Sequence, residues 1–149
     1  MDGIITWLVR SLHVFGAAVW LGGYALMLIV VVPYLSRERN EPLRALAITT
    51  CRVLSWAGAV TVLAGLLLIW RTRGYGSLLA GEWGGIVIVS FVLAFILGAL
   101  GDAVIRPRIR RLDPGKPDTV AAVRRWVAFG LGLGVLTLLM MTRAIYAPT

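Results

Sequence analysis

The chain has 149 residues, of which 59% are hydrophobic and 15% are charged, and its formal net charge at pH 7 is +8. This composition is far more apolar than that of a soluble domain and indicates an integral membrane protein. Strands of a membrane barrel would alternate apolar and polar residues over ~10 positions, and no such alternation is present. The composition therefore predicts an all-α protein. The single cysteine, Cys51, excludes an internal disulfide.

Four apolar stretches follow one another, at about residues 4–34, 53–70, 84–105 and 126–146. Each approaches the ~20 residues that a helix needs to cross a ~30 Å hydrocarbon layer. The first is interpreted as a retained helix rather than a signal peptide, because Arg10 lies within it and the apolar run beyond is too long. Short connections favour antiparallel neighbours, so we expect one transmembrane domain over residues 1–149, an up-down-up-down four-helix bundle.

The basic residues are unevenly distributed along the chain. Eleven of the fifteen lysine and arginine residues flank the first and third connections between the apolar stretches. The positive-inside rule then places these two loops in the cytoplasm and both termini outside. The cluster from Arg106 to Arg111 is interpreted as a topology signal in contact with anionic lipid head groups. The expected partner is therefore the bilayer, and no nucleic-acid partner is expected.

The only histidine of the chain, His13, lies inside the first apolar stretch. An ionisable imidazole within a bilayer is costly without a partner, which makes His13 a candidate functional residue. At helical spacing, Arg10, Gly16 and Trp20 share its face. Gly16 leaves a shallow groove beside the ring, into which a flat ligand or a neighbouring helix could press. Arg10, one turn outward, could pair with a carboxylate.

Two methionines of the last stretch are candidate metal ligands. Helical rise places His13 roughly 13 Å below the outer boundary, and Met140 and Met141 roughly 8 to 9 Å below it. Imidazole and thioether both ligate copper and haem iron. The residues therefore predict a metal site at His13, with Met140 and Met141 as candidate further ligands and either copper or haem b as its cofactor.

Two other interpretations of the histidine stay open at this point. In the first, haem b takes His13 as its axial ligand, Arg10 or Arg143 pairs with the propionates, and Trp20 packs against the edge of the macrocycle. In the second, the imidazole is only hydrogen-bonded inside the bundle, to Thr61, Thr137 or Tyr24. Nothing in the sequence assigns a catalytic residue, because no nucleophile triad, CxxC pair or phosphate-binding loop is present.

A family resemblance adds to this interpretation. The run Leu12-His-Val-Phe-Gly-Ala-Ala-Val-Trp-Leu-Gly-Gly23 resembles the first-helix signature of the copper-resistance protein D (CopD) family. Residues 52–58, 63–67 and 74–79 are similar to that family's second helix and to the loop before its third. The family often has a lysine at the start of the third helix, where this chain has Glu82 and Trp83. The resemblance implies an inner-membrane protein of copper tolerance or uptake, with His13 in the metal-binding role.

The spacing of His13 and Trp20 also resembles that of HemJ-type protoporphyrinogen oxidases, which are four-helix membrane proteins with haem b on a first-helix histidine. The intramembrane lysine of those proteins is missing here. Three functions therefore remain open: copper handling in the outer half of the membrane, a haem-dependent redox protein, and a structural subunit of a membrane complex. A homodimer or a larger complex is a candidate assembly in each case.

Overall fold

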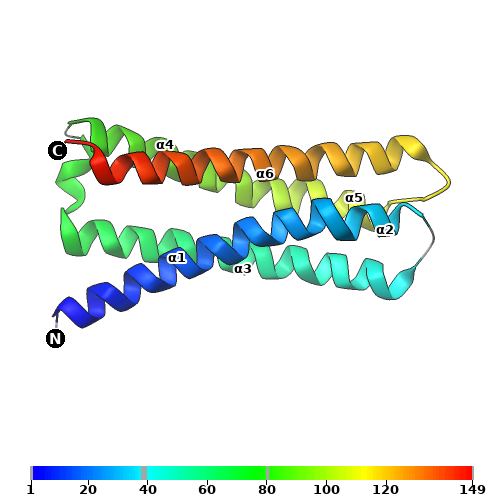
Figure 1. Ribbon diagram of the computed structural model, residues 1–149, viewed down its shortest axis with the longest axis horizontal. Helices are drawn as coiled ribbons and strands as arrows, with labels where there is room; N and C mark the ends of the chain where they lie inside the picture. The colour runs from blue at the N-terminus through cyan, green and yellow to red at the C-terminus, as the bar shows by residue number, and fades with distance from the viewer. Residues whose placement is uncertain (1, 38–39, 80, 149) are drawn as a thin grey trace.

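The computed structural model describes residues 2–37, 40–79 and 81–148. Four long helical spans lie side by side (Figure 1), and no strand occurs in the described residues. The first span comprises α1 (Asp2–Leu26), the π-helical η1 (Met27–Val31) and α2 (Val32–Leu35). The second is α3 (Glu41–Thr72), which the 3₁₀ segment η2 (Tyr75–Leu79) follows. The third comprises α4 (Gly81–Ala99), the π-helical η3 (Leu100–Ile105) and α5 (Arg106–Arg110), and the fourth is α6 (Pro117–Tyr146).

The all-helical class is confirmed, and each of the four spans is long and apolar enough to cross a membrane. The spans are longer than the apolar stretches. The second and fourth helices begin at Glu41 and Pro117, well before the apolar runs at 53 and 126. The reason is local: Asn40 Oδ1 accepts a hydrogen bond from the Leu43 N–H at 2.9 Å, which caps α3. The capping residue sets the start of this helix, whereas the apolar run marks only its most hydrophobic part.

Two π-helical segments precede prolines near the ends of the first and third spans. Pro33 follows η1 and Pro107 follows η3. A proline has no N–H to donate, and its ring crowds the carbonyl four residues earlier. The wider π-helical turn accommodates both effects, so each span continues beyond its proline instead of ending there.

The four spans form two helix pairs. In the first pair α1 lies along α3, and in the second pair α4 lies along α6. The buried Tyr24 connects the two pairs, because its hydroxyl donates to the Leu97 carbonyl at 3.0 Å. A Cβ atom at Gly101 would lie 3.3 Å from that hydroxyl, and Gly130 lies directly against the Tyr24 ring. The glycines of the second pair therefore make room for this aromatic side chain at the centre of the molecule.

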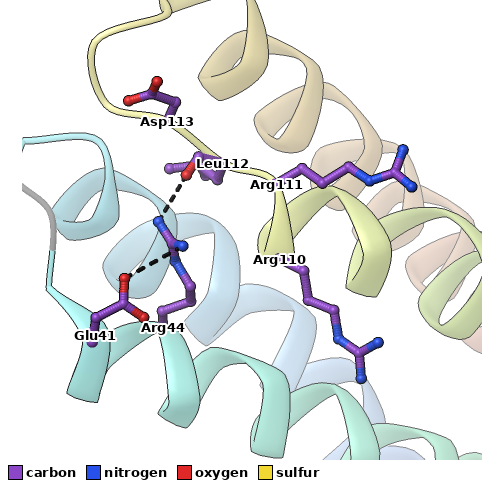
Figure 2. A pocket seen from close by; sticks show the side chains of 6 residues that line it. All are labelled: Glu41, Arg44, Arg110, Arg111, Leu112 and Asp113. Atoms are coloured by element: carbon purple, nitrogen blue, oxygen red, sulfur yellow. Dashed lines mark hydrogen bonds and ion pairs between the residues drawn. The ribbon is translucent and has the colours of Figure 1, made fainter.

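The first turn of α1 and the last turn of α6 lie at one end of the molecule, which we call the terminal end (Figure 1). The end of α2, the start of α3 and the connection at 111–116 lie at the other, the loop end (Figure 1). At the loop end Arg44 donates to the Leu112 carbonyl at 2.8 Å and pairs with Glu41 at 3.4 Å. Figure 2 shows these contacts beside a cavity of about 200 Å³, with Arg110 and Arg111 pointing away from Arg44. Arg44 therefore ties the start of α3 to the third connection.

Candidate functional site

The imidazole of His13 lies against α3. Its Nδ1 atom is 2.7 Å from the Thr61 backbone carbonyl oxygen. A carbonyl oxygen can only accept, so Nδ1 carries the proton and donates it. In the neutral ring the lone pair is then on Nε2. This one hydrogen bond fixes both the tautomer and the orientation of the ring.

Three hydrogen-bond partners were expected for the imidazole, and one of them, Thr61, contacts it through its backbone. The Thr61 hydroxyl itself donates to the Ala57 carbonyl at 2.8 Å. The Thr137 hydroxyl donates to the Leu133 carbonyl at 2.9 Å, within its own helix. Tyr24 donates to a carbonyl of α4, as described above. These side chains are occupied elsewhere, so the Thr61 carbonyl alone orients the ring.

Two glycines allow the close approach of α1 and α3 around the ring. A Cβ atom at Gly65 would lie 3.1 Å from Cε1 and 3.2 Å from Nδ1 of His13. A Cβ atom at Gly16 would lie 2.5 Å from Thr61 Oγ1 and 3.3 Å from the Ala57 carbonyl oxygen. The groove expected at Gly16 is therefore filled by the neighbouring helix. Gly65 was not among the expected site residues, although its spacing of four residues from Thr61 puts both on one face of α3.

The second ring nitrogen has a different environment. Nε2 of His13 forms no hydrogen bond with any of the described residues, and it is not a fully buried atom. The ring as a whole is half-buried. One nitrogen of the imidazole is thus held by the protein, and the other offers its lone pair outside the contact between α1 and α3.

Trp20 and Arg10 lie on the two sides of His13 along α1. Trp20 is only 6% exposed. Its ring packs on Gly58, where a Cβ atom would lie 2.8 Å from Cζ2, so Trp20 belongs to the core. Arg10 is exposed, and within the ranges 2–37, 40–79 and 81–148 it forms no ion pair or hydrogen bond. It borders an open hollow at the terminal end.

The last helix carries the other expected site residues, Met140, Met141 and Arg143. Helix α6 meets α1 on the loop-end side of His13, where Gly134 lies against Leu21. Toward the terminal end α1 diverges from α6 (Figure 1). Metal ligation by Met140 and Met141 together with His13 therefore stays a prediction. Arg143 pairs with Glu82 of α4, with Nη2 2.7 Å from Oε1.

The described part of the chain contains no group of three or more His, Cys, Asp or Glu residues that could hold a metal ion. Cys51 is buried on α3 in the main core cluster, with Leu54 and Trp20.

No protein-family model, curated protein or solved structure matches this chain.

Proposed function

We propose that the protein crosses the inner membrane four times, up-down-up-down, with its termini outside and its first and third connections in the cytoplasm. The support is the set of four apolar spans together with the arginine-rich loop end. Large apolar side chains also face outward from the middle of the helices. Phe15, Trp56, Leu63 and Phe95 are each more than half exposed. Contact with acyl chains accounts for such a surface, which water would penalise.

Within this arrangement, the function that the geometry supports best is copper handling through His13. The observation that carries this proposal is the hydrogen bond from Nδ1 to the Thr61 carbonyl. Metal-ligating histidines almost always donate their other ring N–H to a carbonyl or carboxylate, which fixes the tautomer and raises the basicity of the ligating nitrogen. His13 has this arrangement, with Nε2 as the ligand atom. The resemblance to the CopD family agrees with this role.

Copper fits the surroundings of His13 because a single ion needs no slot between helices. The space beside Gly16 is filled by α3, so a flat ligand does not enter there. One imidazole nitrogen binds copper weakly by itself, and the remaining ligands come from a second copy of the chain or from a partner in a membrane complex. Weak, incomplete coordination suits a residue that receives and releases the ion rather than one that stores it.

Haem b is the second candidate. The observation in its favour is that the chain contains one histidine, and haem needs only one such ligand from the protein. The macrocycle supplies the four equatorial nitrogens, so His13 alone would suffice as axial ligand. Arg10, one turn away and unpaired within the described residues, would hold a propionate. With Gly16 covered and Trp20 in the core, the residues left for haem are the half-buried His13 and the exposed Arg10.

The test is the copper content and visible spectrum of the detergent-purified protein after Cu(I) loading and desalting. We expect the wild type to retain copper and His13→Ala to lose it. Thr137→Ala is the matched control, because it removes another intramembrane polar group that bonds only within its own helix. The double substitution of Met140 and Met141 by leucine tests the predicted thioether ligands: a copper content below that of the wild type assigns them to the site, and an unchanged content leaves His13 as the ligand of this chain.

Each other outcome has a defined meaning. A Soret band that disappears in His13→Ala favours haem b over copper. Equal copper content in the wild type and His13→Ala, with no Soret band, contradicts both candidates and leaves His13 with a structural role. Thermal midpoints of all variants, measured in the same detergent, separate loss of the ligand from loss of the fold.

A further inference from the structure

An open hollow of about 710 Å³ lies at the terminal end between α1 and α3. It is separate from the contact of His13 with Thr61 and begins one helical turn beyond it, at Arg10. Its lining comes from the first turns of α1 and the last turn of α3: Asp2, Gly3, Thr6, Trp7, Arg10, Trp70 and Arg71. Two guanidinium groups and two indoles thus border one hollow.

The charges around the hollow favour an anion. Arg71 is held in place by Thr6, with Nε 3.2 Å from Oγ1, and by Asp2, with Nη2 3.4 Å from Oδ1. The Asp2 side chain is 99% exposed, so water screens its charge. Arg10 has no carboxylate partner in the described ranges. Two guanidinium groups therefore face the hollow with only one well-hydrated carboxylate beside them.

The shape and chemistry of the hollow match a phosphate group attached to a lipid. The planar guanidinium fork binds phosphate oxygens in pairs. Trp7 and Trp70 are each more than half exposed at this end, and indoles collect at the level of lipid head groups. Toward the middle of the helices, the exposed Val14 follows Arg10 by one turn on α1, and the exposed Leu67 and Leu63 precede Trp70 by one and two turns on α3. They provide an apolar track that a free phosphate ion would not use.

We infer that this hollow binds the head group of an anionic glycerophospholipid, with its phosphate between Arg10 and Arg71 and an acyl chain along Val14 and Leu63. A zwitterionic head group would bring an ammonium group toward the two arginines, which disfavours it. The inference rests on the membrane insertion proposed above, but it does not depend on a metal at His13.

The experiment is native mass spectrometry of the detergent-purified protein titrated with phosphatidylglycerol, with phosphatidylcholine of the same acyl chains, or with inorganic phosphate. We expect the wild type to bind phosphatidylglycerol in preference to phosphatidylcholine. Arg10→Gln should weaken phosphatidylglycerol binding about tenfold, which corresponds to losing one charge-assisted contact. Arg10 is the decisive position, because Arg71 also connects α1 to α3 and its loss could loosen the fold.

Arg143→Gln is the matched control, since it removes an arginine at the same end but in the second pair. Equal binding of the two lipids, or unchanged binding in Arg10→Gln, would overturn the inference. Competition by millimolar inorganic phosphate that fully displaces the lipid would instead show an anion site without a lipid preference, which also contradicts it. His13→Ala should bind phosphatidylglycerol normally and Arg10→Gln should retain copper, so failure of the lipid site is distinguishable from failure of copper handling.

Discussion

The two helix pairs share one plan. Each begins with a span in which a π-helical segment precedes a proline, at Pro33 and at Pro107. In each, an arginine from the end of the second helix pairs with an acidic residue at the start of the first. The first pair has Arg71 with Asp2, and the second has Arg143 with Glu82. The same arrangement of helices, proline and ion pair therefore occurs twice in this molecule.

The chemistry does not recur. Twenty residues before Pro33 stands His13, and twenty residues before Pro107 stands Val87. Val87 is buried and apolar, and the second pair still packs closely. An imidazole is thus not needed to hold such a pair together. The comparison agrees with the proposed role of His13 as a ligand, and the following predictions separate the features that the two pairs share from those that they do not.

The largest expected effect comes from Gly16→Leu in the first pair. Even a Cβ atom at this position would meet Thr61 Oγ1 at 2.5 Å, so the larger side chain must push α1 away from α3. We expect a loss of about 1–3 kcal/mol in the free energy of unfolding, measured by SDS titration in mixed micelles. Gly22→Leu is the control on the same helix, because nothing lies within 4 Å of a Cβ atom there. Equal stability of the two variants would contradict the packing of α1 on α3.

A smaller effect is expected from Tyr24→Phe, which tests the connection between the pairs. The substitution removes the hydrogen bond to the Leu97 carbonyl, 3.0 Å long and buried, and keeps the ring. The expected loss is about 0.5–1.5 kcal/mol in the same titration. Tyr34→Phe serves as control, since Tyr34 is exposed near the loop end. A Tyr24→Phe protein as stable as this control would show that the hydroxyl does not link the pairs.

The smallest effect is expected from breaking the ion pair of the second helix pair. Arg143 and Glu82 side chains are 53% and 42% exposed, so hydration and salt screen their attraction. A double-mutant cycle of Arg143→Gln and Glu82→Gln should give a coupling below about 1 kcal/mol. A coupling of several kcal/mol would mean that this pair is a main support of the fold, contrary to its exposure.

The all-helical class and the four long spans follow from the sequence, because they depend on the composition and on the lengths of the apolar runs. Helical rise predicts only the depths of Met140 and His13 along their own helices. The distance between them depends on how α1 packs beside α6, which the sequence of a single helix does not specify. The same limit applies to Trp20, whose place against Gly58 is set by the packing of two helices.

The ligand geometry was only partly predictable. His13 stood out because it is the single histidine, and Thr61 was one of three expected partners. The imidazole of His13 contacts the backbone carbonyl of Thr61 and not its hydroxyl. This contact is possible because Gly65 has no side chain, so the ring can approach α3 closely. Residue types alone do not specify such an approach.

The most direct test of the account is the nitrogen NMR spectrum of the protein labelled with [¹⁵N]histidine, in which a single residue reports. When the ring is neutral, we expect its proton on Nδ1 and an unprotonated Nε2. Addition of Cu(I) should then perturb the Nε2 resonance far more than that of Nδ1. A neutral ring protonated on Nε2, or a spectrum that Cu(I) leaves unchanged, would contradict the assignment of His13 as a metal ligand.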